Sequence, residues 1–491
     1  MKRMWKLLIL VFLLCNIFHV SQSGISDNSV VSIDDISKFN NTLLKSTCNI
    51  SVELKKEIES YKPIANKLIK FITEGKFKGK TWDKLSQFVD KFGSRVAGSQ
   101  NLENSIDFML HTLKKEGLEN VHGESAPVPH WVRGNEHAEL VIPRWQVLPI
   151  LGLGGSIATP ASGITAELLV VASFGELQKK KDLAKGKIVV FNEKYVSYGE
   201  SVKYRDFAAA EAAKLGAVAT LVRSVTPFSI SSPHTGWQDY EQNVTQIPTA
   251  SITVEDAQML HRMFIRGERL VVKLYMEAKN LPPATSRNTV AELKGKSLPD
   301  EVVVVSGHLD SWDVGQGAMD DGGGAFISWV SLAAIQQLGL RPRRTLRAIL
   351  WTAEEEGLWG AQEYVRAHAS DQGKLDFVME SDEGTFTPQG LSFSGSPSAG
   401  CILQEILKLL APINTTHYET PQDGGPDISL WTSKGVPGAS LINANERYFW
   451  FHHSAGDMMT VEDPKALDLC TALWSVASFV VADLSVTLPR Q

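Results

Sequence analysis

Short clusters of histidine and carboxylate residues in the second half of the chain carry side chains that can bind metal ions. They are Gly307-His308-Leu309-Asp310, Met319-Asp320-Asp321-Gly322, Ala353-Glu354-Glu355-Glu356-Gly357, Ser381-Asp382-Glu383 and His452-His453-Ser454-Ala455-Gly456-Asp457. Imidazole nitrogen and carboxylate oxygen are ligands that zinc takes in proteins. Taken singly, each cluster has an ordinary explanation, such as a turn or an acidic start to a helix. Their joint occurrence favours a single metal site.

A pair of zinc ions explains this mixture of residue types. Two zinc ions about 3.5–4 Å apart need a carboxylate between them to offset their repulsion. One histidine and one carboxylate on each ion complete the set, and a further carboxylate must stay off the metals as a general base. Asp310 and Asp457 are suited to orienting a ligand imidazole through its second nitrogen. We therefore expect two Zn²⁺ ions per chain.

The segments around these clusters alternate between predicted strands and helices. The strands are residues 301–306, 345–352, 376–380 and 436–443, and the helices are residues 323–337, 358–368, 398–411 and 463–484. This alternation predicts an α/β fold with a mostly parallel central sheet flanked by helices. Because reactive groups gather at the carboxyl ends of such strands, the clusters should meet at one edge of the sheet.

The N-terminal part of the chain has the composition of a leader. Residues 1–23 combine a basic start, an apolar stretch and small residues, which is the pattern of a cleaved signal peptide. The polar residues 24–60 are predicted to be a pro-segment or linker. We expect residues 61–130 to form the first part of the catalytic domain and residues 284–491 to form its metal-binding part.

Residues 131–283 differ in character from the segments on either side. Short apolar runs lie between glycine and proline residues, which predicts an inserted β-rich domain. The run Lys185-Gly186-Lys187-Ile188-Val189-Val190 and the later run Ala212-Ala213-Lys214-Leu215-Gly216-Ala217 resemble the protease-associated domain of several secreted peptidases. An unrelated β-rich lid is the alternative.

Charge and glycosylation motifs indicate the cellular route and exclude some partners. The net charge of the 491-residue chain is −6, and no run of basic residues exceeds three, so we expect no nucleic-acid partner. Sequons predict N-glycosylation at Asn40, Asn49, Asn243 and Asn414. Together with the signal peptide they predict a secreted protein, or one kept in the lysosome, Golgi or endoplasmic reticulum. We expect no membrane span in the mature chain.

The order of the motifs resembles one enzyme family. The series Gly-His-X-Asp, Asp-Asp-Gly, Glu-Glu-X-Gly and His-Ser-X-Gly-Asp is similar to the co-catalytic zinc exopeptidases, which include bacterial leucyl aminopeptidases. The longer runs WDVGQGAMDDGGGAF, LWTAEEEGLWGA, VMESDEGTF and FHHSAGDMMTVEDP resemble its glutamate carboxypeptidase members. This resemblance covers most of residues 61–491.

The resemblance implies a role for each candidate residue. The implied metal ligands are His308, Asp320, Glu355, Asp382 and His453. Asp320 would bridge the two metals, with a cis bond to the next residue, and Glu354 would be the general base that activates a metal-bridging water. The family pattern also implies hydrolysis of small peptides, in particular dipeptides with free termini, a homodimer and an inhibitory pro-segment within residues 24–60.

Two neighbours of these residues are expected to stay off the metals. Glu356 departs from many relatives and is expected to point outward. His452 precedes the predicted ligand His453, and adjacent side chains on an extended backbone point to opposite sides. We therefore expect His452 at the edge of the pocket.

Other functions on the same fold remain open from the sequence. A non-catalytic, receptor-like relative would have lost metal ligands, and none is missing here. A single-zinc acyl transferase of the glutaminyl cyclase kind would bind one metal per chain. An aminopeptidase acting on longer peptides would share the whole site.

Overall fold

The computed structural model describes Cys48 and residues 50–422 and 424–490. The predicted signal peptide, most of the predicted pro-segment, and the sequons at Asn40 and Asn49 lie outside these residues. Residues 50–491 form one compact unit, which is described here by itself.

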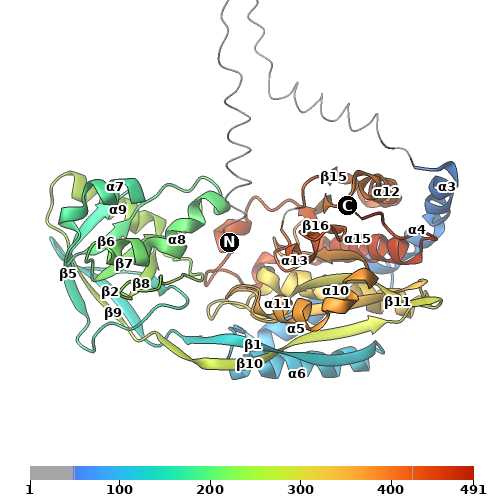
Figure 1. Ribbon diagram of the computed structural model, residues 1–491, viewed down its shortest axis with the longest axis horizontal. Helices are drawn as coiled ribbons and strands as arrows, with labels where there is room; N and C mark the ends of the chain where they lie inside the picture. The colour runs from blue at the N-terminus through green and yellow to red at the C-terminus, as the bar shows by residue number, and fades with distance from the viewer. Residues whose placement is uncertain (1–47, 49, 423, 491) are drawn as a thin grey trace, which may run out of the picture. The chain divides into compact units, whose positions relative to one another are not determined.

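In the described part of the chain, the predicted catalytic domain is built around a central eight-stranded sheet (Figure 1). Its spatial order is β1 (Glu119–Val132), β10 (Lys279–Leu293), β12 (Arg344–Trp351), β11 (Leu298–His308), β13 (Leu375–Glu380), β16 (Gly438–Asn443), β14 (Pro388–Ser394) and β15 (His417–Glu419). The four middle strands, β12, β11, β13 and β16, pair in parallel. Strands β1, β10 and β14 pair with their inner neighbours antiparallel. The predicted parallel core is confirmed, and the edges make the sheet mixed.

Helices cover both faces of this sheet, as the alternation predicts. In β11, Val302 and Val304 pack with α11 (Trp359–Ala367) and α13 (Ser429–Thr432). The alternate side chains of β11 face α10 (Gly323–Gln337) and α15 (Pro464–Asp483), which contact the strand from the other side. Strand residues such as Val303 and Val305 are fully buried, so the sheet has the apolar composition of a two-sided core.

Helix α15 passes the length and hydropathy test for a membrane span, which the sequence prediction did not anticipate. In the structure 94% of its apolar window is buried inside the protein. Asp463 caps its N-terminus by accepting a hydrogen bond from the backbone of Ala466. Helix α15 is therefore a core helix of this domain.

Helices at the start of the described chain pack against this domain. They are α3 (Val52–Ser60), α4 (Lys62–Thr73), α5 (Lys80–Phe92) and α6 (Gln100–Lys115). Residues 52–60, predicted to belong to a linker, form helix α3, whose Ile58 is buried. Glu57 of this helix accepts a hydrogen bond from the backbone of Ser485. The end of the predicted linker is thus part of the folded domain.

A second eight-stranded sheet of the described chain lies within the predicted insert (Figure 1). Its order is β3 (Gln146–Leu148), β2 (Glu136–Ile142), β9 (Val271–Met276), β5 (Ile164–Val171), β6 (Ile188–Phe191), β7 (Ala219–Arg223), β8 (Thr249–Ile252) and β4 (Ile150–Gly152). The helices beside it are α7 (Phe174–Lys179), α8 (Tyr198–Ala213) and α9 (Val254–Ile265). The predicted boundaries, residues 131 and 283, fall inside the paired strands β1 and β10.

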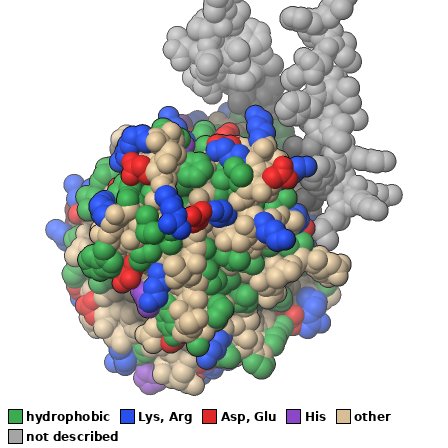
Figure 2. Space-filling model, turned by 90° about the vertical axis from the view of Figure 1, so that its left-hand side faces the viewer, with side chains coloured by type: hydrophobic (Ala, Val, Ile, Leu, Met, Phe, Trp, Pro, Cys, Tyr) green, Lys and Arg blue, Asp and Glu red, His purple; other side chains and the backbone are tan. Residues whose placement is uncertain are grey.

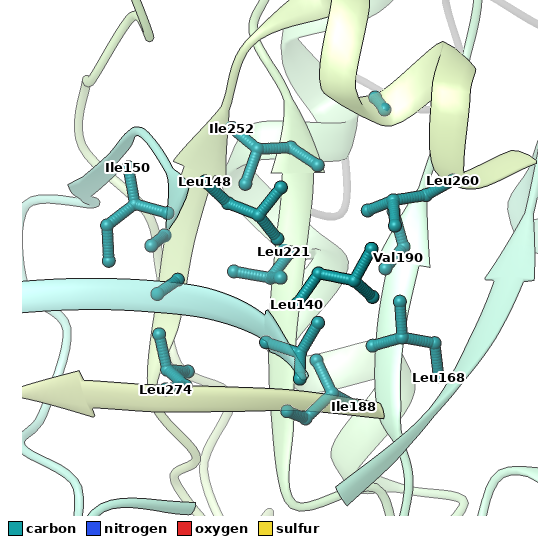
Figure 3. Packing of buried hydrophobic residues seen from close by; sticks show 14 of the residues in the cluster. Leu140, Leu148, Ile150, Leu168, Ile188, Val190, Leu221, Ile252, Leu260 and Leu274 are labelled. Carbon is teal, nitrogen blue, oxygen red and sulfur yellow. The ribbon is translucent and has the colours of Figure 1, made fainter. Parts of the chain in front are cut away.

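The second sheet has its own apolar core. Leu140, Val190, Leu221 and Leu260 point toward one another between the strands and α9 (Figure 3). This end of the molecule presents hydrophobic side chains between lysine and arginine side chains (Figure 2).

The remaining short elements connect these layers. They are the π-helical turn Ala318–Gly322, α12 (Pro397–Leu407), α14 (Tyr448–Phe451) and the 3₁₀ turns Lys181–Leu183, Ala369–Lys374, Lys408–Ile413 and Met459–Val461.

Candidate active site

The carboxyl ends of three adjacent parallel strands carry most of the predicted site. His308 is the last residue of β11, Glu354 and Glu355 follow β12, and Asp382 follows β13. Asp320 lies in the turn before α10, and its peptide bond to the next residue is cis, as the resemblance implies. The predicted edge of the sheet is therefore where these side chains meet.

His308 forms the centre of one donor group. Its Nε2 lies 3.2 Å from Asp320 Oδ1 and 3.0 Å from Asp382 Oδ1. Its Nδ1 lies 3.0 Å from the backbone oxygen of Asp310, which can only accept. Nδ1 therefore donates to this carbonyl, and Nε2 faces the centre of the group, where it could bind a metal ion.

His453 has the same arrangement on the other oxygen of Asp320. Its Nε2 lies 2.8 Å from Glu355 Oε2 and 3.5 Å from Asp320 Oδ2. Its Nδ1 lies 3.3 Å from the backbone oxygen of Thr235, in the inserted domain. Both predicted histidine ligands therefore have an outer nitrogen on a carbonyl and an inner nitrogen facing carboxylates.

His452 lines the cavity, but the prediction that its side chain and that of His453 point to opposite sides is wrong. The rings of His452 and His453 are stacked with centroids 3.5 Å apart, and His452 Nε2 lies 3.6 Å from Asp320 Oδ2. His453 has a φ of +57°, so the backbone of the pair is not extended and the side chains do not alternate. Ligand atoms of Asp320, His452 and His453 lie within 4.8 Å of one another, as do those of His308, Asp320 and Asp382.

Asp457 supports the site in a different way from the one predicted. Its carboxylate touches no ligand imidazole but accepts three backbone N–H groups of the turn that carries Asp320. Oδ1 accepts from Ala318 at 3.0 Å and from Met319 at 2.8 Å, and Oδ2 accepts from Asp320 at 3.2 Å. The carboxylate thus positions the backbone of the central aspartate.

Asp310 orients a histidine, but chiefly through its backbone. Its carbonyl oxygen accepts from His308, while the carboxylate oxygen nearest that ring is 3.7 Å away. The carboxylate instead accepts the backbone N–H groups of Glu354, at 3.2 Å, and of Glu355, at 3.3 Å. Asp310 therefore fixes the two adjacent glutamates relative to His308.

The side chains of the triple-glutamate run go in different directions. Glu355 faces His453, whereas Glu354 Oε2 lies 3.9 Å from His308 Nε2 and lines the cavity. Glu356 is only 5% exposed and accepts a hydrogen bond from the backbone of Ala97, so the prediction that it points outward is wrong. The segment before α6 covers this part of the turn, which local sequence does not show.

Burial and close charges shift the pKa values of the titratable groups in the site. Burial, and then the negative charges of neighbouring carboxylates, raise the pKa of both Glu354 and Glu355 well above the usual range. Burial and the charge on Asp320 likewise raise the pKa of Asp382 to about 7. Burial lowers the pKa of His453 far below its usual value, so its ring is neutral. Against the effect of burial, the charge of Asp382 and the hydrogen bonds with Asp320 and Asp382 raise the pKa of His308 well above its usual value. Histidine rings among crowded carboxylates fit a site for multivalent cations.

The site opens into a cavity of about 620 Å³. One wall comes from the catalytic domain and includes Gln422, Gly425 and Tyr448, whose hydroxyl donates to the backbone oxygen of Asp382. The opposite wall comes from the inserted domain and includes the side chains Tyr198, Arg205, Asp206, Trp237 and Asp239. The insert thus supplies one wall of the cavity.

Comparison with known proteins identifies the family. The pattern of peptidase family M28 matches residues 288–478. Carboxypeptidase Q of Xenopus laevis is 55% identical over 438 residues, which cover 89% of this chain and 93% of that protein. The chain belongs to peptidase family M28. Human carboxypeptidase Q is 52% identical with the same coverage.

Solved structures agree with this M28 assignment. A peptidase M28 precursor from Shewanella amazonensis superposes with a TM-score of 0.84 at 31% identity, covering 88% of this chain and 99% of that one. The zinc aminopeptidase BSAP from Bacillus subtilis shares the fold, with a TM-score of 0.63 at 20% identity over 84% and 99% of the two chains. The protein is a metallo-exopeptidase with the predicted α/β fold.

Sequence reasoning missed several residues of this M28 site. Arg205, His234 and Thr235 reach it from the insert, more than 200 residues before His453. No local motif in the sequence marks these three residues. The burial of Arg205 on α8 is unusual for an arginine, but it becomes visible only in the structure. The two described sequons, Asn243 and Asn414, are exposed on the surface, as a glycan requires.

Proposed function

We propose that the protein is a two-zinc exopeptidase that hydrolyses dipeptides with free termini. The observation that carries this proposal is the arrangement around Asp320, whose two carboxylate oxygens face two different donor groups. Two histidine-and-carboxylate groups on one shared carboxylate suit a pair of cations better than a single cation.

Each group can hold one zinc ion. His308 and Asp382 would hold one with Asp320 Oδ1, while Glu355 and His453 would hold the other with Asp320 Oδ2. Bound there, the ions would polarise the scissile carbonyl and lower the pKa of the attacking water. The single-zinc alternative leaves one of the two groups without a cation.

Glu354 is the proposed general base. Its Oε2 lies 3.9 Å from His308 Nε2, and Asp310 holds the backbone of the glutamate pair by accepting both of its N–H groups. From this position its carboxylate takes a proton from water and passes it to the leaving amine.

The matched substitutions Glu354→Gln and Glu355→Gln test these roles. Glu354→Gln should lower kcat at least about 10²-fold and keep two zinc ions per chain, because it removes a proton acceptor and no ligand. Glu355→Gln should lower the zinc content, because it weakens a ligand. Zinc counting by mass spectrometry and single-turnover kinetics measure both. Zinc loss in the Glu354 variant alone would reverse the assignment.

The substrate class is supported by the cavity, which has walls from both the catalytic domain and the insert, and by the carboxypeptidase Q relatives. We expect kcat/KM to fall at least tenfold when a good dipeptide substrate is extended by one residue at either end, because an added residue would meet the wall that the insert supplies. The assay compares the dipeptide with both tripeptides. Faster cleavage of longer peptides from the N-terminus would favour a general aminopeptidase instead.

Three further properties complete the proposal. The protein would enter the secretory pathway, carry glycans at Asn243 and Asn414, and be held inactive by a pro-segment within residues 24–60. It would act as a homodimer. Secretion from cells, glycosidase digestion, and light scattering of the purified protein test these points, and an unprocessed chain with full activity would exclude the inhibitory role.

A further inference from the structure

The charges that line the cavity are strongly one-sided. Among the described lining residues, Arg205 is the one lysine or arginine, whereas the acidic side chains are Asp206, Asp239, Asp320, Glu354, Glu355, Asp382 and Glu383. A peptide with free termini brings a carboxylate into this cavity. Apart from the zinc ions proposed at Asp320, Glu355 and Asp382, Arg205 is the one positive group among the described lining residues, so it is the natural partner for that carboxylate.

Arg205 is held rigidly in the insert wall. Its Nε donates to the backbone oxygen of Trp237 at 3.1 Å and to Asp206 Oδ1 at 3.4 Å, and Nη1 donates to the hydroxyl of Tyr198 at 2.9 Å. The side chain needs the space left by Gly236, where a Cβ atom would lie 2.2 Å from Nη1. A guanidinium fixed in this way loses little entropy on binding a ligand.

One edge of the guanidinium remains available. Its hydrogen bonds use Nε and Nη1, and no acceptor for Nη2 occurs among the described residues. Arg205 lines the cavity, although the residue is only 8% exposed. A donor in such a sheltered position gives strong charge-assisted hydrogen bonds to a carboxylate.

We propose that Arg205 binds the C-terminal carboxylate of the substrate and so selects peptides that end one residue after the scissile bond. This inference rests on the proposed exopeptidase function and names the residue that sets its length preference.

The distance between Arg205 and the proposed metal ligands matches the length of one substrate residue. Arg205 Nη1 lies 3.4 Å from Nδ1 of His453, whose other nitrogen faces Glu355. The guanidinium is therefore about one imidazole ring away from the proposed ligand atoms. In a dipeptide, three bonds separate the carboxylate carbon from the scissile carbonyl carbon, a distance of about 4 Å at most. A longer C-terminal extension would replace the charged carboxylate by a neutral amide and meet the Trp237 wall.

The test compares a dipeptide with the same dipeptide carrying a C-terminal amide. It uses the full-length protein, Arg205→Met, Arg205→Lys and a control, Lys203→Met, which removes an exposed cation from the same helix. We expect the unmodified protein to favour the free acid by about 10²-fold or more in kcat/KM. Arg205→Met should reduce that preference at least tenfold, mainly by raising KM for the acid, and Arg205→Lys should retain part of it. Lys203→Met should behave like the unmodified protein.

The outcomes separate this inference from the proposed function. Zinc content and thermal stability of each variant are measured alongside the kinetics. If Arg205→Met slows both substrates equally and the preference survives, Arg205 is a structural residue and the inference is wrong. An unmodified protein that cleaves acid and amide equally also overturns it, and leaves the zinc peptidase standing. Failure of the unmodified protein to cleave dipeptides would overturn the proposed function and this inference with it.

Discussion

The substitution Asp457→Asn tests how the central aspartate is positioned. Asp457 is buried, and both of its oxygens accept backbone N–H groups from residues 318–320. Burial raises the pKa of this carboxyl to about 7, yet three donors and the nearby Arg95 guanidinium favour its ionised form. An amide of the same shape keeps one acceptor oxygen and places an NH₂ group against a donor.

The cost follows from these contacts. In its better orientation asparagine keeps the bonds to Ala318 and Met319 and loses the bond to Asp320. Loss of one hydrogen bond to a charged acceptor costs about 1.5–3 kcal/mol, and weakening of the other two brings the total to about 3 kcal/mol. With an unfolding entropy of about 2.1 cal/mol/K per residue over the Ile50–Gln491 unit, Tm should fall by about 3 °C. Zinc affinity should fall about 10- to 100-fold because Asp320 is less well held.

The assay combines thermal unfolding, zinc content after dialysis against a weak chelator, and kcat/KM. Asp463→Asn is the matched control, because Asp463 accepts a single backbone N–H at the start of α15 and is exposed. Asparagine caps helices about as well as aspartate, so the control should keep its stability and its zinc. Equal Tm and equal zinc content in the two variants would show that the turn does not depend on Asp457.

Two more predictions concern the histidine pair and a buried glutamate. His453→Ala should lower the zinc content, because this ring faces Glu355, while His452→Ala should keep two zinc ions and change only kcat or specificity; the opposite result would make His452 the ligand. Burial raises the pKa of Glu462 to about 8, so the folded protein keeps a proton there that the unfolded chain loses near the ordinary pKa of 4.5. Stability from this group is therefore complete below about pH 4.5 and is lost as pH rises to about 8. Relative to Glu462→Gln, the Tm of the unmodified protein should fall from pH 5 to pH 8, and a constant Tm difference would refute the effect.

Local sequence patterns determined the framework of the catalytic domain. The predicted helix at 323–337 agrees with α10, and the predicted strands lie within a residue or two of β12 and β13. Such segments are set by apolar periodicity along the chain, which the sequence displays directly. The grouping of His308, Glu354 and Asp382 followed as well, because parallel strands end at one edge of their sheet.

Side-chain directions in the turns were decided by tertiary structure. The positive φ of His453 brings two adjacent rings to the same side, and the covering segment at Ala97 buries Glu356. Asp310 and Asp457 bind backbone N–H groups rather than ligand imidazoles, a choice that depends on loops far apart in the sequence.

The contacts that the insert makes with the site could likewise not be predicted from the sequence. Arg205 and Thr235 reach His453 across 248 and 218 residues of chain, respectively. The sequence by itself determined which residue types were present and which elements carried them, because both are encoded locally. Only the packing of the inserted domain against the edge of the central sheet decided which of those residues close the cavity. Contacts between distant segments depend on the three-dimensional path of the whole chain, and no local pattern records that path.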